Sequence, residues 1–214
     1  MIPLTDVSRR PTSFPIVTLS IIAVNVLVFV LELLNGEVAK WALIPADVAA
    51  GHNLYTLVTA MFLHGSWSHI IGNMVFFWAF GPEIEDEMGP WRYAIFYLLG
   101  GIVANLAQVA MDPHSTIPNL GASGAIAAVM GAFLVTFPQD QIRSLLVIGI
   151  FVRVAYVPAV LLVGGWFLLQ LWSAGTVIET QAGGVAYVAH IGGFVFGCVF
   201  ARLFASPSTR TSVW

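Results

Sequence analysis

The sequence predicts an all-α, polytopic membrane protein: a six-transmembrane-helix bundle with a long, partly embedded first outer loop. Two observations predict this class. Of the 214 residues, 58% are hydrophobic and only 9% are charged, whereas an ordinary soluble domain is about one quarter charged. The apolar residues also gather in six runs, several near the ~20 residues that cross a hydrocarbon core of about 30 Å as a helix. Lipid is therefore the expected solvent for most of the chain.

The six predicted spans are separated by Gly, Pro and Asn residues, which end helices and start turns. The first span is longer than the apolar core of a signal peptide and no small-x-small cleavage site follows it, so it is interpreted as a retained anchor. The apolar run 145–152 would cover only about 12 Å as a helix, so we expect it at the interface in the fourth loop. The predicted spans are 16–34, 68–80, 91–111, 123–137, 154–172 and 185–204.

The basic residues predict that the N- and C-termini are both cytoplasmic. With six crossings and an inner N-terminus, Lys40 is the one basic residue of eight that falls outside. The other seven fall inside: Arg9, Arg10, Arg92, Arg143, Arg153, Arg202 and Arg210. We expect a short cytoplasmic tail over 1–15, a membrane domain over 16–204 and a C-terminal tail over 205–214. Minimal tails without a transit peptide favour a bacterial plasma (inner) membrane.

The first loop, residues 35–67, is too apolar for open water and too short in its apolar stretches to span. We expect it to lie in the outer interface, packed on the bundle.

Composition and spacing argue against several kinds of partner. The net charge is −3 and basic residues do not cluster with aromatic ones, which argues against nucleic acid. The single cysteine, Cys198, gives neither a disulfide framework nor a thiolate metal site. His64 and His69 are five residues apart and do not share a helix face as the i, i+4 pair of metalloproteases does. We therefore expect no metal and no cofactor.

Three polar residues from different spans are expected at one depth. Ser123, His69 and His190 each lie 14 residues from the predicted inner end of their spans, marked by Phe137, Glu83 and Phe204. At 1.5 Å per residue this is about 21 Å. Polar groups inside spans are costly and point to function.

These residues have complementary chemistry. A serine hydroxyl needs a base to become a nucleophile, and His190 is the histidine in a later span that could accept its proton, which would form a Ser-His dyad. His69 and Asn73, at i and i+4, share a helix face and could donate to an oxyanion, as could the backbone N–H of Ser123. Gly121 and Gly124 leave room beside the serine.

Four segments resemble signature segments of the rhomboid family of intramembrane serine proteases: "HGSWSHIIGN", "FGPEIEDEMG", "GASGA" and "AHIGGFVFG". The resemblance implies that the membrane domain is catalytic, with Ser123 and His190 as the dyad. It also implies that the positions of His69 and Asn73 serve the oxyanion hole and that His64 is mainly structural. Substrates of the family are single-spanning membrane proteins, cut in or near their transmembrane segment.

The sequence departs from the family at two places. Tyr55-Thr56 replaces a Trp-Arg pair of the first loop, and Ala127 replaces a tyrosine that packs on the catalytic histidine in some members. What orients His190 is therefore open.

Other functions and simpler interpretations stay open. The chain could be a catalytically silent relative that binds membrane clients, or, less in keeping with the sequence, a transporter or proton channel. The small residues from Gly121 onward could form only a packing face. Gly193 and Gly197, spaced as GxxxG, are predicted to bring the last span against the fourth.

Further polar residues have structural interpretations. We expect Glu32 to reach out of the membrane by snorkelling and the acidic run 83–87 to be a solvated turn. Asn25, Asn105 and Gln108 are expected to form hydrogen bonds between helices.

Overall fold

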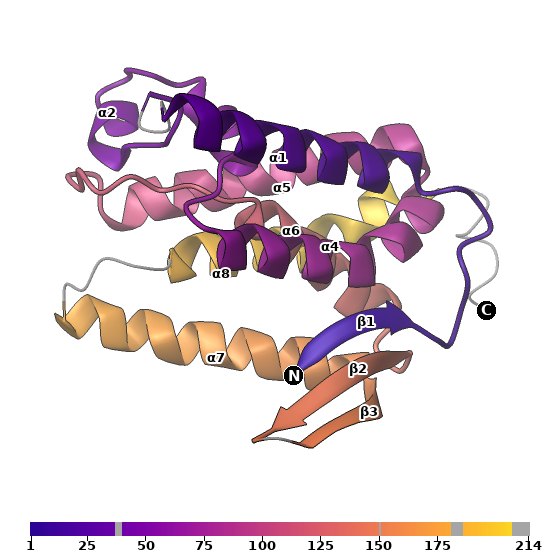
Figure 1. Cartoon of the computed structure of the whole chain (residues 1–214). Helices are drawn as coiled ribbons and strands as arrows, with labels where there is room; N and C mark the ends of the chain where they lie inside the picture. Colours follow the sequence, from indigo (N-terminus) through magenta and orange to yellow (C-terminus); the bar gives the residue numbers. More distant parts are fainter. Residues whose placement is uncertain (37–39, 150, 181–185, 207–214) are drawn as a thin grey trace.

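The computed structural model describes residues 1–36, 40–149, 151–180 and 186–206. Long helices dominate it and run side by side, with α6 in the middle (Figure 1). The long helices are α1 (Ile16–Asn35), α4 (Trp67–Met88), α5 (Pro90–Met111), α6 (Ser123–Thr136), α7 (Ala159–Thr180) and α8 (Tyr187–Phe204). The remaining elements are α2 (Pro45–Ala49), α3 (Thr56–Thr59), the 3-10 helix η1 (Ala60–Phe62), β1 (Ile2–Asp6), β2 (Gln141–Ile148) and β3 (Phe151–Pro158).

Several helices are apolar enough to lie in a membrane. Among the described residues, α1, α5 and α8 have the length and composition to cross one, while α6 and residues 159–174 of α7 are shorter apolar helices. The predominantly helical membrane architecture is confirmed at this level, and the number of six crossings stays a prediction.

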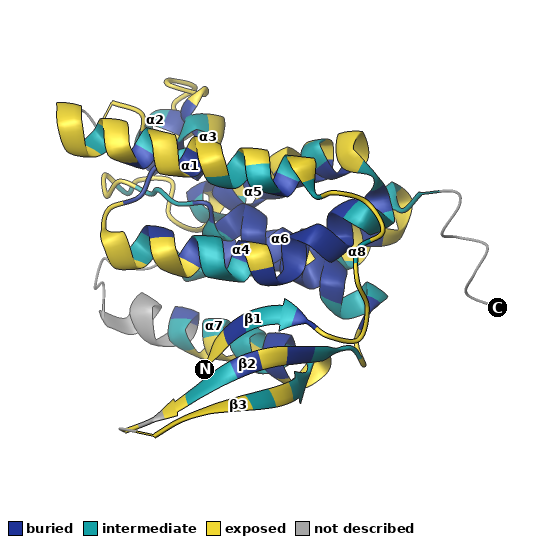
Figure 2. Cartoon of the chain, turned by 45° about the vertical axis from the view of Figure 1, so that its right-hand side comes forward, coloured by how far each residue is buried: buried dark blue, intermediate teal, exposed yellow. Residues whose placement is uncertain are grey.

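The core of the bundle is α6, whose residues from Gly124 to Phe133 are all buried. Figure 2 shows it as a dark blue helix surrounded by the others. A helix of 14 residues rises about 21 Å, less than a hydrocarbon core of about 30 Å. Because protein surrounds it, α6 does not need to match the bilayer.

Glycines let α6 and α8 approach closely. A Cβ atom at Gly193 would overlap the carbonyl oxygen of Gly124, and one at Gly197 would overlap that of Ala128. From the other side, a Cβ at Gly131 would overlap the carbonyl oxygen of Phe194. The prediction that Gly193 and Gly197 bring the last span against the fourth is therefore confirmed.

The second predicted span is longer than expected, and the prediction of a solvated acidic turn is wrong. α4 continues through Pro82 to Met88, and Glu83 and Glu85 are buried. The Glu85 carboxylate accepts hydrogen bonds from the backbone N–H groups of Val17 and Thr18, both at 2.8 Å. An anion at a helix N-terminus satisfies N–H groups that have no partner within the helix, so Glu85 fixes the start of α1 on α4.

A three-stranded antiparallel sheet was not predicted. β2 pairs with β3 as a hairpin and with β1 on its other edge. The run 145–152, expected as an interfacial loop, lies in this hairpin, and α7 begins at residue 159 and not 154. Gly149 turns the hairpin with a φ of 60°. Residues 2–6 of the expected N-terminal tail thus pack onto the body, and residues 207–214 of the expected C-terminal tail lie outside the described residues.

The first loop packs on the bundle, as expected. Its residues Leu43, Ala60 and Met61 are buried, and Met61 belongs to the main hydrophobic core. Figure 1 shows α2 at the same end of the bundle as the loop that precedes α6. We call this end, which carries the first loop and residues 112–122, the loop end, and the opposite end, with the α4–α5 turn at Gly89, the turn end.

Of three polar residues given structural roles by the sequence, two differ from their expected roles. Glu32 does not snorkel, because its Oε2 accepts from the backbone N–H of His64 at 3.2 Å and ties α1 to the segment that precedes α4. Asn105 of α5 does bond to another helix, as expected: it donates to the carbonyl oxygen of Leu57 in α3, and it also accepts from Asn119 in the loop before α6. Asn25 donates within its own helix, to the carbonyl oxygen of Ile21. These amides and carboxylates therefore hold loops and helix turns in place.

Candidate active site

Ser123 is the first residue of α6, and the segment before it is fixed to the first loop. The backbone N–H of Gly121 donates to the carbonyl oxygen of Ala60 at 2.8 Å, and Asn119 exchanges two backbone hydrogen bonds with Leu43. Gly121 has a φ of 127°, a conformation open mainly to glycine. Ala122 precedes the helix and has no polar side chain to cap it. The N–H groups of the first turn, including that of Ser123, are thus free of partners within the helix.

Ser123 and His190 form a hydrogen bond across the α6–α8 contact. The Ser123 Oγ and His190 Nε2 atoms are 2.6 Å apart, and the His190 side chain is 8% exposed. On the other side of the ring, His190 Nδ1 is 2.7 Å from Oε1 of Gln170, a residue of α7. Since an amide oxygen only accepts, the ring proton belongs on Nδ1, which leaves Nε2 free to accept the serine proton. The structure therefore brings together the two residues of the predicted dyad.

Two aromatic rings also contact His190. The ring centroid of Trp166, on α7, lies 5.8 Å from that of His190, and Tyr187 stands edge-on to it at 6.4 Å. Ala127, which replaces the family's tyrosine, is fully buried in α6. The contacts that orient His190 in this chain thus come from α7 and from its own helix.

Gln170 is the site residue that the sequence did not assign. In the sequence it is one polar residue within the predicted span 154–172. The signal that could have found it is its spacing: Trp166 and Gln170, at i and i+4, share one face of α7. Which way that face points could not be read from the sequence.

His69 and Asn73 reach the backbone just before Ser123. His69 is held at the start of α4, where Ser66 Oγ accepts its backbone N–H at 3.2 Å. A Cβ atom built on Gly121 would lie 2.7 Å from Nε2 of His69 and 3.7 Å from Nδ2 of Asn73. Both side chains therefore lie against this turn, as donors to an oxyanion beside Ser123 would need to.

His64 holds Asn73 in place. It is 2% exposed, and its Nε2 lies 2.9 Å from Nδ2 of Asn73. Burial, with the nearby His69 adding to it, lowers the pKa of His64 to about 4, so the ring is neutral near pH 7. A neutral Nε2 accepts from the amide of Asn73 and fixes its orientation.

The two glycines expected beside the serine have different surroundings. Gly121 faces His69, whereas a Cβ at Gly124 would collide with the Cβ of Ala104 on α5. The room at Gly124 is thus used for helix packing rather than left open beside the serine. Within the part of the chain that the structure describes, no three His, Cys, Asp or Glu side chains form a group that could hold a metal ion.

Comparison with known proteins agrees with the resemblance. A family model described as the rhomboid domain matches residues 51–207. The chain is 31% identical over 152 residues to "Rhomboid-like protein 11, chloroplastic" of Arabidopsis thaliana, an alignment that covers 70% of this chain and 52% of that protein.

Two bacterial relatives come from Bacillus subtilis (strain 168). "Rhomboid protease GluP" is 30% identical over 141 residues, covering 63% of this chain and 27% of the relative. "Putative rhomboid protease YdcA" is 28% identical over 128 residues, covering 56% of this chain and 62% of the relative. The chain thus spans between about a quarter and three fifths of the length of these relatives. The family match covers most of the chain, including every residue of the site, and the chain is therefore an integral membrane protein of the rhomboid family.

Proposed function

We propose that this protein is an intramembrane serine endopeptidase that cleaves single-spanning membrane proteins in or near their transmembrane segment. The observation that carries the proposal is the 2.6 Å hydrogen bond between Ser123 Oγ and His190 Nε2, because a base within this distance can activate a serine. The names of the two Bacillus relatives support the same activity.

The proposed mechanism uses a dyad in place of a triad. His190 Nε2 takes the hydroxyl proton as Ser123 Oγ attacks the peptide carbonyl carbon, and the imidazolium then gives that proton to the leaving amine as the C–N bond breaks. Water, with His190 again as base, hydrolyses the acyl-enzyme and frees the serine. His69, Asn73 and the Ser123 N–H stabilise the oxyanion of each tetrahedral intermediate, while His64, Gly121 and Gly124 have structural roles.

The proposal includes an orientation. The loop end faces the outer side, so water reaches the serine from there, and both termini are cytoplasmic. Basic residues at the turn end support this assignment: Arg9 lies over the ring of Phe137, and Arg92 donates to the carbonyl oxygen of Ala205. The proposed location is a bacterial plasma (inner) membrane, with lipid and transmembrane substrates as partners and no nucleic acid.

The direct test is cleavage of a fluorogenic transmembrane substrate by purified protein in detergent. We expect the wild type to cleave it, and Ser123→Ala and His190→Ala to lose at least 10³-fold in rate. Ser20→Ala is the matched control, because Ser20 lies on the exposed side of α1 and only bonds the carbonyl oxygen of Ile16. Equal turnover by wild type and Ser123→Ala would refute the mechanism.

A fluorophosphonate probe separates the alternatives. It should label Ser123 in the wild type and fail to label the His190→Ala variant, since an unactivated serine reacts slowly. A folded wild type that neither cleaves nor reacts would favour a silent client-binding relative. Solute flux that survives Ser123→Ala would favour a transporter.

A further inference from the structure

We infer that Gln170 is the positioning residue for His190: it takes the place that an acidic residue has in a Ser-His-Asp triad, as a neutral acceptor supplied by α7. This inference rests on the proposed function for its kinetic consequences, but the geometry is independent of it. The hydrogen bonds run from Ser123 through His190 to Gln170 and link α6, α8 and α7.

The arrangement defines the tautomer of His190. With Oε1 of Gln170 at 2.7 Å, Nδ1 must carry the proton, and Nε2 then presents its lone pair to the serine. Loss of the acceptor would leave a buried Nδ1–H without a partner, which is unfavourable. The tautomer with the proton on Nε2, which cannot accept from serine, would then gain population.

A neutral amide and a carboxylate differ in one respect that an experiment can measure. Both accept from Nδ1–H, but only a carboxylate attracts the imidazolium that forms during the reaction. Among the described residues, Gln170, Trp166 and Tyr187 contact the His190 ring in addition to Ser123, and His69, on a neighbouring helix, is a titratable group that interacts with it. A carboxylate at position 170 would add an acidic group to this set.

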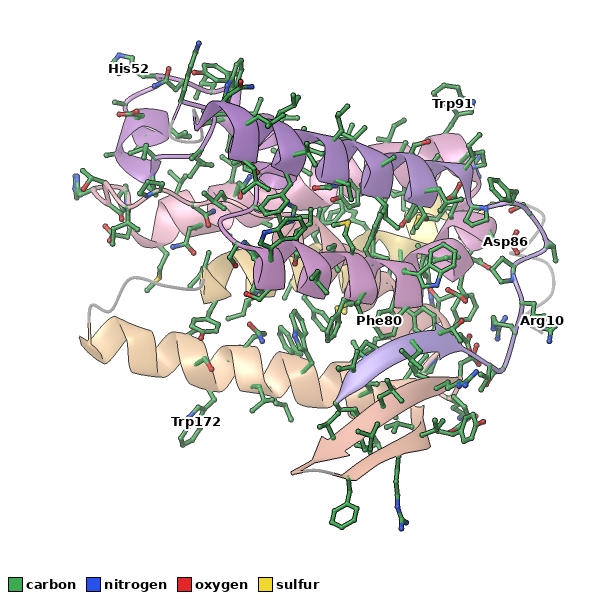
Figure 3. The ribbon with its side chains drawn as sticks, viewed as in Figure 1. Arg10, His52, Phe80, Asp86, Trp91 and Trp172 are labelled. Carbon is green, nitrogen blue, oxygen red and sulfur yellow. The ribbon has the colours of Figure 1, made fainter. Side chains whose placement is uncertain are left out.

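In the part of α7 whose side chains the structure describes, one face contacts the site and another is exposed. Trp166 and Gln170 face His190, while Leu168, Leu169 and Trp172 on the same helix are between 63% and 75% exposed. Figure 3 shows Trp172 pointing away from the bundle, and Figure 1 shows α7 at its edge. The orientation of His190 therefore depends on α7 staying docked against α8.

The experiment compares Gln170→Leu and Gln170→Glu with Leu169→Ala as a control on the exposed side of α7. We expect Gln170→Leu to lower kcat at least 10-fold with KM unchanged within twofold. Gln170→Glu should retain activity and move the acid limb of the kcat profile to higher pH, because the carboxylate stabilises the imidazolium. A residue that served only to pack α7 would leave this limb in place.

Two results would overturn the inference: Gln170→Leu with kcat within twofold of wild type, or Gln170→Glu with an unmoved acid limb. If all forms including the wild type fail to cleave, the proposed function fails, and ¹⁵N NMR of the imidazole still tests Gln170. The signal that vanishes in His190→Ala should show protonated Nδ1 in the wild type and a mixture of tautomers in Gln170→Leu. Protonated Nε2 in the wild type would overturn the inference by itself.

Discussion

Gly121 is the residue on which the shape of the turn before Ser123 depends. Its φ of 127° is accessible at low cost only to glycine, and its missing side chain is the space that His69 and Asn73 approach. A methyl group there would meet Nε2 of His69 at 2.7 Å. Position 121 therefore needs glycine for two reasons: the backbone has a positive φ, and a side chain would collide with His69.

Gly121→Ala is expected to lower the cleavage rate at least 10-fold. The methyl group displaces His69 from the turn and strains the backbone by about 1–3 kcal/mol, so both the oxyanion donor and the entry into α6 move. Turnover of the transmembrane substrate and thermal unfolding in detergent are the measurements. Gly72→Ala is the control, since a Cβ at Gly72 in α4 meets nothing within 4 Å; equal activity of the two variants would contradict the role of Gly121.

The sequence predicts the residues that meet at the serine better than the residues that support them. Ser123 and His190 carry chemistry that few other residues of the spans share, so the requirement for a nucleophile and a base selects them. Gln170 is one of several amides in spans, and Asn25 and Asn105 have the same chemistry but bond backbone carbonyls. Only the rotation of α7 against α8 distinguishes them, and that rotation follows from tertiary packing.

Strand β1 contains a buried acid that should make its attachment sensitive to pH. Asp6 is 5% exposed and accepts from the backbone N–H of Ser8 at 2.8 Å. Burial raises the pKa of Asp6 from 3.8 to about 6; the Ser8 hydrogen bond opposes this shift, and the neighbouring Asp140 adds to it. The folded state thus binds a proton more tightly than the unfolded chain. The stability of this region is greatest below about pH 4, falls as the pH rises toward 6, and is level above that.

Asp6→Asn should remove the loss of stability that the wild type shows as the pH rises from about 4 to 6. At pH 7.5 the variant should be more stable than the wild type by about 1–3 kcal/mol, whereas at pH 4 the two should unfold at nearly the same temperature. Thermal unfolding in detergent at both pH values measures the difference. Asp112→Asn, a change at an exposed loop carboxylate, is the control. A variant that is less stable than the wild type at pH 7.5 would show that the Asp6 carboxylate stabilises the strand.

At the level of elements, helices followed from the sequence and strands did not. The starts of α1 and α6 were predicted to the residue, because apolar runs and flanking Pro or Gly mark them. The hairpin was missed because a short apolar run fits a strand or a buried helix equally well. Its pairing with β1 joins segments more than 130 residues apart, which no local pattern reveals. The burial of Glu85 was not predicted for the same reason, since α1, the helix whose N-terminus it caps, lies far from it in the sequence.

At the scale of the whole molecule, the segments before α1 and after α8 are both attached to one end of the bundle. Near the N-terminus, the Asp86 carboxylate accepts from the backbone N–H groups of Thr12 and Ser13 at 3.0 and 2.9 Å. After α8, the backbone N–H of Ser206 donates to the carbonyl oxygen of Glu87 at 2.9 Å. Both contacts are made at the turn end, next to Gly89. This placement is what the six-span prediction requires, because an even number of crossings returns the chain to the side of the membrane on which it began.

This arrangement predicts which residues a reagent reaches from outside a cell. Arg10 and His52 are both exposed and lie at opposite ends of the molecule (Figure 3). In a Cys198→Ala background expressed in bacteria, Arg10→Cys and His52→Cys each present one thiol, and the background alone should remain unlabelled. The proposed orientation places the loop end outside, since Arg9 and Arg92 lie at the turn end. A membrane-impermeant maleimide should therefore label His52→Cys in intact cells and Arg10→Cys only after lysis. The opposite labelling pattern would show that the orientation is inverted and that water reaches the serine from the inside. Labelling of both variants in intact cells would contradict the placement of the two residues on opposite sides of the membrane.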